Sequence, residues 1–161
     1  MSTFREPSDD DVVAVSELLG RDVAGRFAVV VRRPDGRAVV IENEPHLRDG
    51  TPMPTLYWLV DRELSEHVSR LEGAGGVHRY EEIVDPRELA AAHERYGARR
   101  DAAIVRAQLI APTGGVGGTR TGVKCLHAHL ANWLVTRDDP VGALVAAEVP
   151  LPATVTVDVR A

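Results

Sequence analysis

The stretch FAVVVRRPDGRAVVI, residues 27–41, decides the fold of this chain. It holds two valine-rich runs, Phe27–Arg33 and Arg37–Ile41, which Pro34-Asp35-Gly36 separates. Valine and isoleucine favour strands, and a short turn of this composition is typical of a β-hairpin. We therefore expect the other elements to be arranged around two antiparallel strands.

Helix and strand patterns follow on both sides of this hairpin. Ser8 and the three aspartates after it predict the start of a helix that ends at Gly20. The other expected elements are a strand over 55–60, a helix over 62–73, a long helix from Pro86 to about Ile110, a helix after Val123, a short helix from Asp139 and a strand over 154–159. The stretches 42–54 and 111–122 are predicted to be loops. This pattern predicts an α+β fold, a single domain over residues 1–161 whose antiparallel sheet of about four strands is covered by helices.

The composition excludes several classes of protein. The chain has 161 residues, of which 44% are hydrophobic and 27% charged, values typical of one globular domain. Its formal net charge of −5 disfavours broad binding to nucleic acid or to an anionic membrane. No apolar run approaches the roughly 18 residues of a spanning helix, and the acidic start of the chain does not resemble a signal peptide. We expect a cytoplasmic protein without nucleic-acid or membrane partners; a homo-oligomer is left open.

Residues that carry chemistry are densest over 114–129, GGVGGTRTGVKCLHAH. Five glycines and a helix start would leave backbone N–H groups free to bind a phosphate or a carboxylate. Eighteen of the nineteen basic residues are Arg, so the single Lys124, next to the single cysteine, suggests a position that requires an ammonium group. The candidate anion-binding residues of this segment are Gly117, Gly118, Thr119, Arg120, Thr121 and Lys124. A P-loop does not fit, because Val123 separates the lysine from the last glycine. The structural alternative is a flexible connector.

Three residues in the same segment are candidates for catalysis: Cys125, His127 and His129. Leucine spacing favours a helix here, on which Cys125 and His129, four positions apart, would share a face while His127 points elsewhere. The pair could then supply two metal ligands or a thiol–imidazole pair. The helix start and Lys124 would lower the pKa of the thiol. The alternative is that Cys125 is a small buried side chain.

A second candidate surface lies on the predicted helix that begins at Pro86. His93, Tyr96 and Arg100 fall on its inward-facing stripe, and buried polar groups need hydrogen-bond partners. A bound anion or an acid such as Glu72 could be that partner. The alternative is a purely structural hydrogen-bond network.

Several motifs, taken in order, resemble the bacterial, mainly actinobacterial, domain-of-unknown-function family 501 over about residues 25–146. These motifs are Asp49–Leu59 (DGTPMPTLYWL), Arg70-Leu71-Glu72, the segment with His93, Tyr96 and Arg100, Gly117–His129 and Asp139-Pro140-Val141-Gly142. The resemblance implies no settled activity. It does imply that genes of this family often lie near the genes for an exopolyphosphatase, enolase and a septum-formation protein. This gene neighbourhood is associated with phosphate chemistry. The family strand usually continues Thr-Cys-Pro where this chain has Val60-Asp61-Arg62, so a cysteine-rich zinc site is not expected.

Three hypotheses of function follow, and the sequence identifies neither a cofactor nor a reaction. The first is an enzyme, for example a hydrolase, that acts on a phosphorylated or other anionic small molecule. The glycine loop with Arg120 and Lys124 would hold the anion. His129 or His127 would transfer protons next to Cys125, and His93, Tyr96 and Arg100 would form the opposite wall. The second is a metal-binding protein that uses Cys125, His129 and either His93 or His46. The third is a non-catalytic partner of the division or envelope machinery. We expect the glycine loop and the His93 face to share one pocket.

Overall fold

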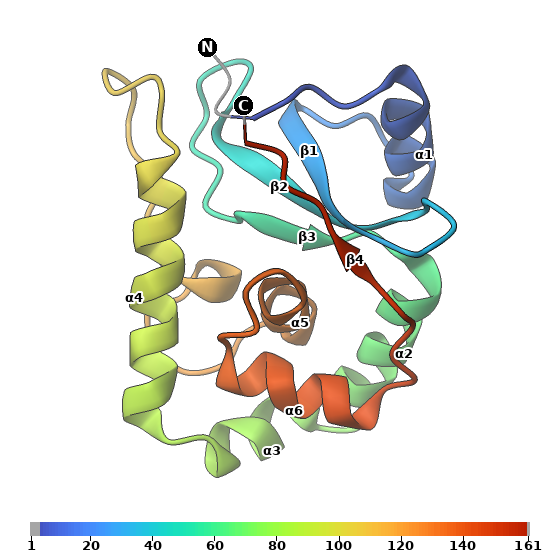
Figure 1. Cartoon of the computed structure of the whole chain (residues 1–161). Helices are drawn as coiled ribbons and strands as arrows, with labels where there is room; N and C mark the ends of the chain where they lie inside the picture. The colour runs from blue at the N-terminus through green and yellow to red at the C-terminus, as the bar shows by residue number, and fades with distance from the viewer. Residues whose placement is uncertain (1–3, 161) are drawn as a thin grey trace.

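The computed structural model describes residues 4–160 and contains a four-stranded antiparallel sheet in the order β3-β2-β1-β4 (Figure 1). The strands are β1 (Gly25–Arg32), β2 (Ala38–Leu47), β3 (Tyr57–Leu59) and β4 (Val155–Thr156). Helices cover this sheet, so the predicted α+β class is confirmed.

The hairpin of β1 and β2 forms as predicted but is longer than the sequence suggested. The turn closes through Arg33, whose N–H donates to the carbonyl of Arg37 at 2.8 Å. Strand β2 continues to Leu47, so the prediction of a loop from residue 42 is wrong as far as Leu47. The polar residues Glu42 and Asn43 pair with β1 and are buried, which a preference for apolar strands could not indicate.

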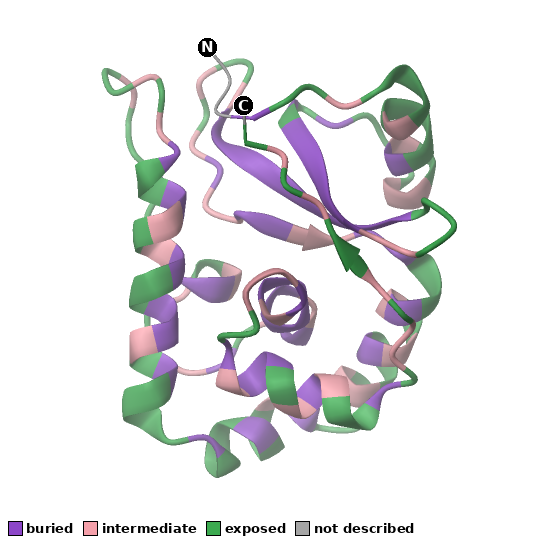
Figure 2. Ribbon diagram, in the orientation of Figure 1, coloured by how far each residue is buried: buried purple, intermediate pink, exposed green. Residues whose placement is uncertain are grey.

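Six α-helices and one short 3₁₀ helix complete the described chain. They are α1 (Asp9–Leu19), α2 (Arg62–Gly73), α3 (Gly76–Ile83), α4 (Pro86–Ala102), η1 (Val116–Gly118), α5 (Leu126–Thr136) and α6 (Pro140–Glu148). Helix α1 packs on one face of the sheet, and α5 lies against the other face (Figure 1). Strands β1 and β2 and helix α5 are mostly buried, whereas β4 is exposed (Figure 2). Helix α5 is the central helix of the main core.

Local sequence signals place most helix ends correctly. Ser8 caps α1, Gly20 ends it in the left-handed conformation, and the side chains of Asp61, Asp85 and Asp139 cap α2, α4 and α6.

Two predictions about helices are wrong. Helix α4 ends at Ala102 and not near Ile110, because 3₁₀-type bonds such as that from the amide of Ala103 to the carbonyl of Arg100 close its last turn. Helix α3 was not predicted; it begins after Gly75, whose φ of 84° needs a glycine.

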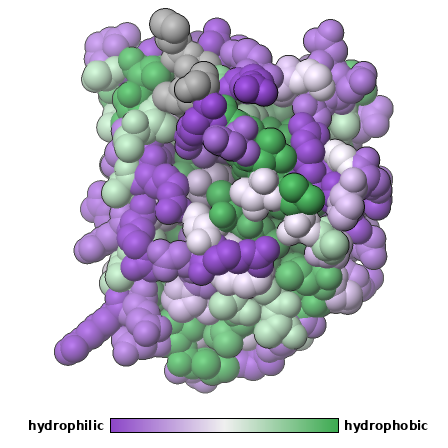
Figure 3. Space-filling view, in the orientation of Figure 1, coloured by the Kyte–Doolittle hydropathy of each residue, from purple (hydrophilic) through white to green (hydrophobic). Residues whose placement is uncertain are grey.

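The surface offers no membrane-spanning element among the described residues. No helix there is both long enough and apolar enough to cross a bilayer. Figure 3 shows apolar side chains on the lower part of the face in view, over α6, with hydrophilic side chains around them.

Candidate functional site

Helix α5 begins one residue later than a Cys125–His129 pair requires. Cys125 is the residue before the helix, with an extended backbone at φ −141° and ψ 114°. The amide of the next residue, Leu126, donates to Oε1 of Glu72 at 3.1 Å, so a side chain from α2 caps this helix start. The pairing of Cys125 with His129 on one helical face is therefore not what the structure shows.

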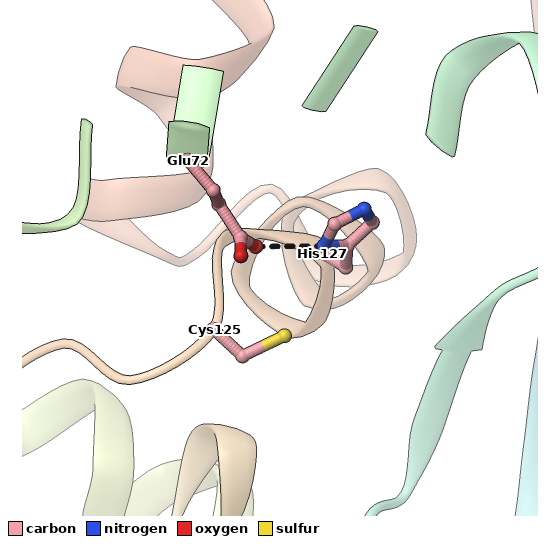
Figure 4. Close-up of side chains that lie close together, drawn as sticks. All are labelled: Glu72, Cys125 and His127. Atoms are coloured by element: carbon pink, nitrogen blue, oxygen red, sulfur yellow. Dashed lines mark hydrogen bonds and ion pairs between the residues drawn. The ribbon is translucent and has the colours of Figure 1, made fainter. Parts of the chain in front are cut away.

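Cys125 lies instead with Glu72 and His127. Nδ1 of His127 lies 2.7 Å from Oε1 of Glu72. The donor atoms of the three residues all lie within 4.8 Å of one another (Figure 4). Glu72 reaches the cluster from the end of α2, while the other two come from the start of α5 (Figure 4). All three side chains are partly exposed, so a ligand from solvent can reach the cluster.

The hydrogen bonds of His127 determine its charge. Its Nε2 lies 3.0 Å from the carbonyl oxygen of Ser65, and its Nδ1 contacts Glu72. The carbonyl oxygen of Ser65 can only accept a hydrogen bond, so this contact favours a proton on Nε2, and the contact with the carboxyl group of Glu72 favours one on Nδ1. The hydroxyl of Ser69 also lies 3.1 Å from Nε2. The contact with Cys125 and the charge of Glu72 outweigh burial and raise the pKa of His127 to about 9.

The pKa of the Cys125 thiol shifts in the opposite direction to that of His127. Burial alone would raise its pKa, but hydrogen bonds from His127 and from the amide of Ala128 outweigh burial and lower it. The cluster therefore combines a thiol of lowered pKa, an imidazole of raised pKa and the carboxyl group of Glu72.

His129 belongs to a different and fully buried network. Its Nδ1 donates to Asp139, with both carboxylate oxygens at 2.9 Å. Asp139 also accepts from the side chain of Asn132 at 2.9 Å and from the amide of Gly142 at 2.8 Å. Burial alone would raise the pKa of Asp139, but these hydrogen bonds lower it. The network joins α5 to α6, and neither His129 nor Asp139 has an exposed side chain.

His93 ties together the two ends of the glycine-rich loop. Its Nδ1 accepts from the amide of Val116 at 3.0 Å, so the other nitrogen, Nε2, donates to the carbonyl of Gly122 at 2.8 Å. Its ring also meets that of His129 edge to face, with centroids 5.8 Å apart. Burial, the largest cause, lowers the pKa of His93, and His129 adds to this effect. His93 is a neutral side chain that positions the loop.

The side chains of Tyr96 and Arg100 form hydrogen bonds with backbone groups. The hydroxyl oxygen of Tyr96 accepts from the amides of Leu56 and Tyr57. Arg100, which is 2% exposed, donates to the carbonyl oxygens of Pro54, Pro112 and Gly114. Glu72, suggested by the sequence as a partner for this stripe, lies with His127 instead.

Most glycines of the loop make close contacts with other segments. A Cβ on Gly115 would lie 2.6 Å from Cβ and Nδ1 of His93. Gly117, with φ 70°, lies against Cys125 and Lys124, and Gly122 lies against Glu81. Glycine is thus required here by close approach and by positive φ.

Among the predicted anion-binding residues, Thr119 forms a hydrogen bond within the loop, whereas Arg120 and Lys124 are exposed. Thr119 donates to the carbonyl of Thr121 at 2.8 Å, and Gly118 ends η1. Arg120 and Lys124 are exposed and make no ion pair within residues 4–160.

The loop and the His93 face do line one groove of about 480 Å³. Its lining includes His93, Arg100, Gly114, Gly115 and Arg120. Cys125, His127 and His129 do not line it, so the structure separates the groove from the Cys125 cluster.

Glu72 in the Cys125 cluster and Asp139 beside His129 were not found from the sequence as site residues. Glu72 lies 55 positions from His127, and no local pattern relates them. Asp139 was expected only as the start of a helix.

Comparison with known proteins gives one match. The family described as Protein of unknown function (DUF501) matches residues 29–147, which confirms the resemblance carried by the motifs. Neither the curated proteins nor the solved structures contain a match.

Proposed function

Because the chain belongs to the DUF501 family, we propose its function from the geometry: the protein binds a divalent, zinc-like metal ion between Glu72, Cys125 and His127. The observation that carries this proposal is the convergence of three donor atoms, from the end of α2, the residue before α5 and the first turn of α5, within 4.8 Å of one another. An assembly of sulfur, nitrogen and oxygen ligands matches the preferences of Zn²⁺ and Co²⁺.

The hydrogen bonds around the cluster support this proposal. Nε2 of His127 is held by the carbonyl of Ser65, as is typical of a metal-ligating histidine, whose second nitrogen usually donates to an oxygen. Nδ1 then faces Glu72 and Cys125, and its proton is the one that a metal ion would displace. A bound metal ion would take the place of that proton, with the sulfur of Cys125 and the carboxylate oxygen of Glu72 as its other ligands.

Three protein ligands correspond to a reactive rather than a purely structural zinc site. Structural zinc sites have four protein ligands, whereas catalytic ones leave one position for water or substrate. Lys124, the residue before Cys125 in the chain, is exposed and makes no ion pair within residues 4–160, so its ammonium group is available for an anion. The function that we propose is therefore metal-dependent chemistry, such as hydrolysis, on a phosphorylated or other anionic small molecule.

Cobalt binding tests the metal site. We expect Co²⁺ added to the metal-free protein to give a thiolate-to-cobalt charge-transfer band and to bind with a stoichiometry of one. Cys125→Ser should abolish this band, and Glu72→Gln and His127→Gln should weaken binding by about tenfold or more. The matched controls are Glu66→Gln on the same helix and His78→Ala, both at exposed positions. A normal band in Cys125→Ser, or no band in the unmodified protein, would contradict the proposal.

A second candidate function is thiol chemistry without a metal, favoured by the lowered pKa of Cys125 beside a protonated His127. In this case the protein would fail to bind Co²⁺, yet iodoacetamide would alkylate Cys125 faster than it alkylates a free cysteine near neutral pH. Slow alkylation together with no cobalt binding would contradict both candidates.

A further inference from the structure

A second pocket, of about 350 Å³, lies at the far end of β2. It is lined by Arg26, Glu44, His46, Arg48, Val105 and Arg106. Residues from β1, β2 and the segment after α4 thus meet there. It shares no residue with the Cys125 cluster or with the groove beside the glycine-rich loop.

The unusual feature of this pocket is the carboxylate of Glu44. The residue is only 6% exposed, and its Oε1 is buried without a hydrogen-bond partner. It makes no ion pair within residues 4–160, although three arginines line the same pocket. Burying a charged oxygen without a partner is costly, and such groups in a folded protein are nearly always satisfied. A carboxyl group that lines a pocket and lacks a partner in the described chain favours a ligand that brings a hydrogen-bond donor to Glu44.

Two of the arginines, Arg48 and Arg106, bond to backbone carbonyls, and all three keep most of their N–H groups available. Nη1 of Arg48 donates to the carbonyl of Val23 at 2.8 Å, and Arg106 donates to the carbonyls of Leu47 and Arg48. Arg26 forms one exposed ion pair, with Glu6 at 3.3 Å. Each guanidinium has five N–H donors, so these contacts position the groups without saturating them.

His46 forms a fixed part of the wall. Its Nε2 lies 2.8 Å from the carbonyl oxygen of Ile110, which ties β2 to the segment after α4. The lining therefore combines the buried carboxyl group of Glu44 with the guanidinium groups of three arginines.

We propose that this pocket binds a small acidic amino acid, with its ammonium group on Glu44 and its carboxylates on the arginines. A metal cation would meet three positive charges, and a simple phosphate or dicarboxylate would meet the unpaired carboxylate of Glu44. A ligand with one ammonium and two carboxylates satisfies both sets of groups. The pocket volume exceeds what such a small molecule needs, so it also has space for bound water. This inference is independent of the proposed metal site.

Calorimetric titration of the full chain with L-glutamate tests the proposal. Glutarate serves as the matched probe because it keeps both carboxylates and lacks the amine. We expect L-glutamate to bind at one site and glutarate to bind about tenfold more weakly or worse, which corresponds to about 1.4 kcal/mol. Absence of glutamate binding, or equal binding of the two compounds, would overturn the proposal.

Single substitutions test which residues contact the ammonium group and the carboxylates of the ligand. Glu44→Gln should weaken glutamate binding by about tenfold or more and reduce the preference for glutamate over glutarate. Arg26→Gln, at an exposed position, should weaken the binding of both compounds, while Arg87→Gln, also exposed, should change neither. If Glu44→Gln does not fold, the glutarate comparison and Arg26→Gln decide the question. Unchanged glutamate binding in folded Glu44→Gln or in Arg26→Gln would overturn the assignment.

Discussion

Nδ1 of His127 lies 2.7 Å from Oε1 of Glu72, although the two residues are 55 positions apart. The same oxygen accepts the amide N–H of Leu126, so a single carboxylate both caps α5 and orients the imidazole. The Cys125 cluster is consequently complete only when the end of α2 is packed against the start of α5. This coupling joins the proposed metal site to the folding of the main core.

Zinc should protect Cys125 from alkylation. The thiol is partly exposed. As a metal ligand its sulfur would donate a lone pair to the ion and would be a weaker nucleophile toward iodoacetamide. We expect saturating Zn²⁺ to slow the reaction with iodoacetamide by about tenfold or more, and Mg²⁺, which prefers oxygen ligands, to have no effect. Mass spectrometry of the intact protein measures the rate. Equal rates with and without Zn²⁺ would argue against thiolate ligation.

Gly115→Ala should destabilise the fold by about 1–3 kcal/mol, because the added methyl group would overlap His93. The cost is steric, since φ at Gly115 is −104°. Gly73→Ala is the matched control: its added methyl would meet nothing within 4 Å, and we expect no loss of stability beyond about 0.5 kcal/mol. Urea denaturation measures both. Equal stability of the two variants would show that the contact with His93 is not a constraint.

Arg100→Lys should lower the free energy of unfolding by about 1–3 kcal/mol. A lysine cannot reproduce the contacts of the guanidinium group with three backbone carbonyls, and it would leave buried acceptors unsatisfied. Arg87→Lys, at an exposed position, should be nearly neutral. Thermal unfolding compares the two variants. An Arg100→Lys protein as stable as the wild type would show that these contacts are not needed for stability and that Arg100 is available to bind an anion.

Stability should depend on pH through His93. Burial lowers its pKa in the folded chain, so the unfolded chain takes up the proton first as the pH falls. The stability contributed by neutral His93 is present above about pH 6.5 and is lost as the pH falls through the lowered pKa. We therefore expect the wild type to lose more unfolding free energy than His93→Gln between about pH 7 and pH 5. Parallel pH profiles from urea denaturation would refute this role.

Features that depend on neighbouring residues could be predicted from the sequence. The hairpin turn at Pro34-Asp35-Gly36 and the helix starts at Pro86 and Asp139 depend on local preferences, and the structure confirms them. The family resemblance is confirmed for the same reason, because it depends on motifs along the chain.

Features that depend on distant contacts could not be predicted. Cys125 lies outside α5 because Glu72 caps the helix, and periodicity alone placed Cys125 on the helix. Glu42 and Glu44 form part of a buried strand because β1 pairs with it, although carboxylates are unfavourable in strands. The glycines at 115 and 117 suggested exposed amides, whereas the folded chain needs them for close contacts with His93 and Cys125.

Zinc content measured after equilibrium dialysis tests the proposed metal site most directly. Protein stripped with a chelator is dialysed against Zn²⁺ buffered at a low free concentration, and the bound metal is quantified by mass spectrometry. We expect one zinc ion per chain in the wild type and in His78→Ala, and almost none in Cys125→Ser. A wild-type protein that retains no zinc, or a Cys125→Ser variant that retains one ion per chain, would show that Glu72, Cys125 and His127 do not form a metal centre.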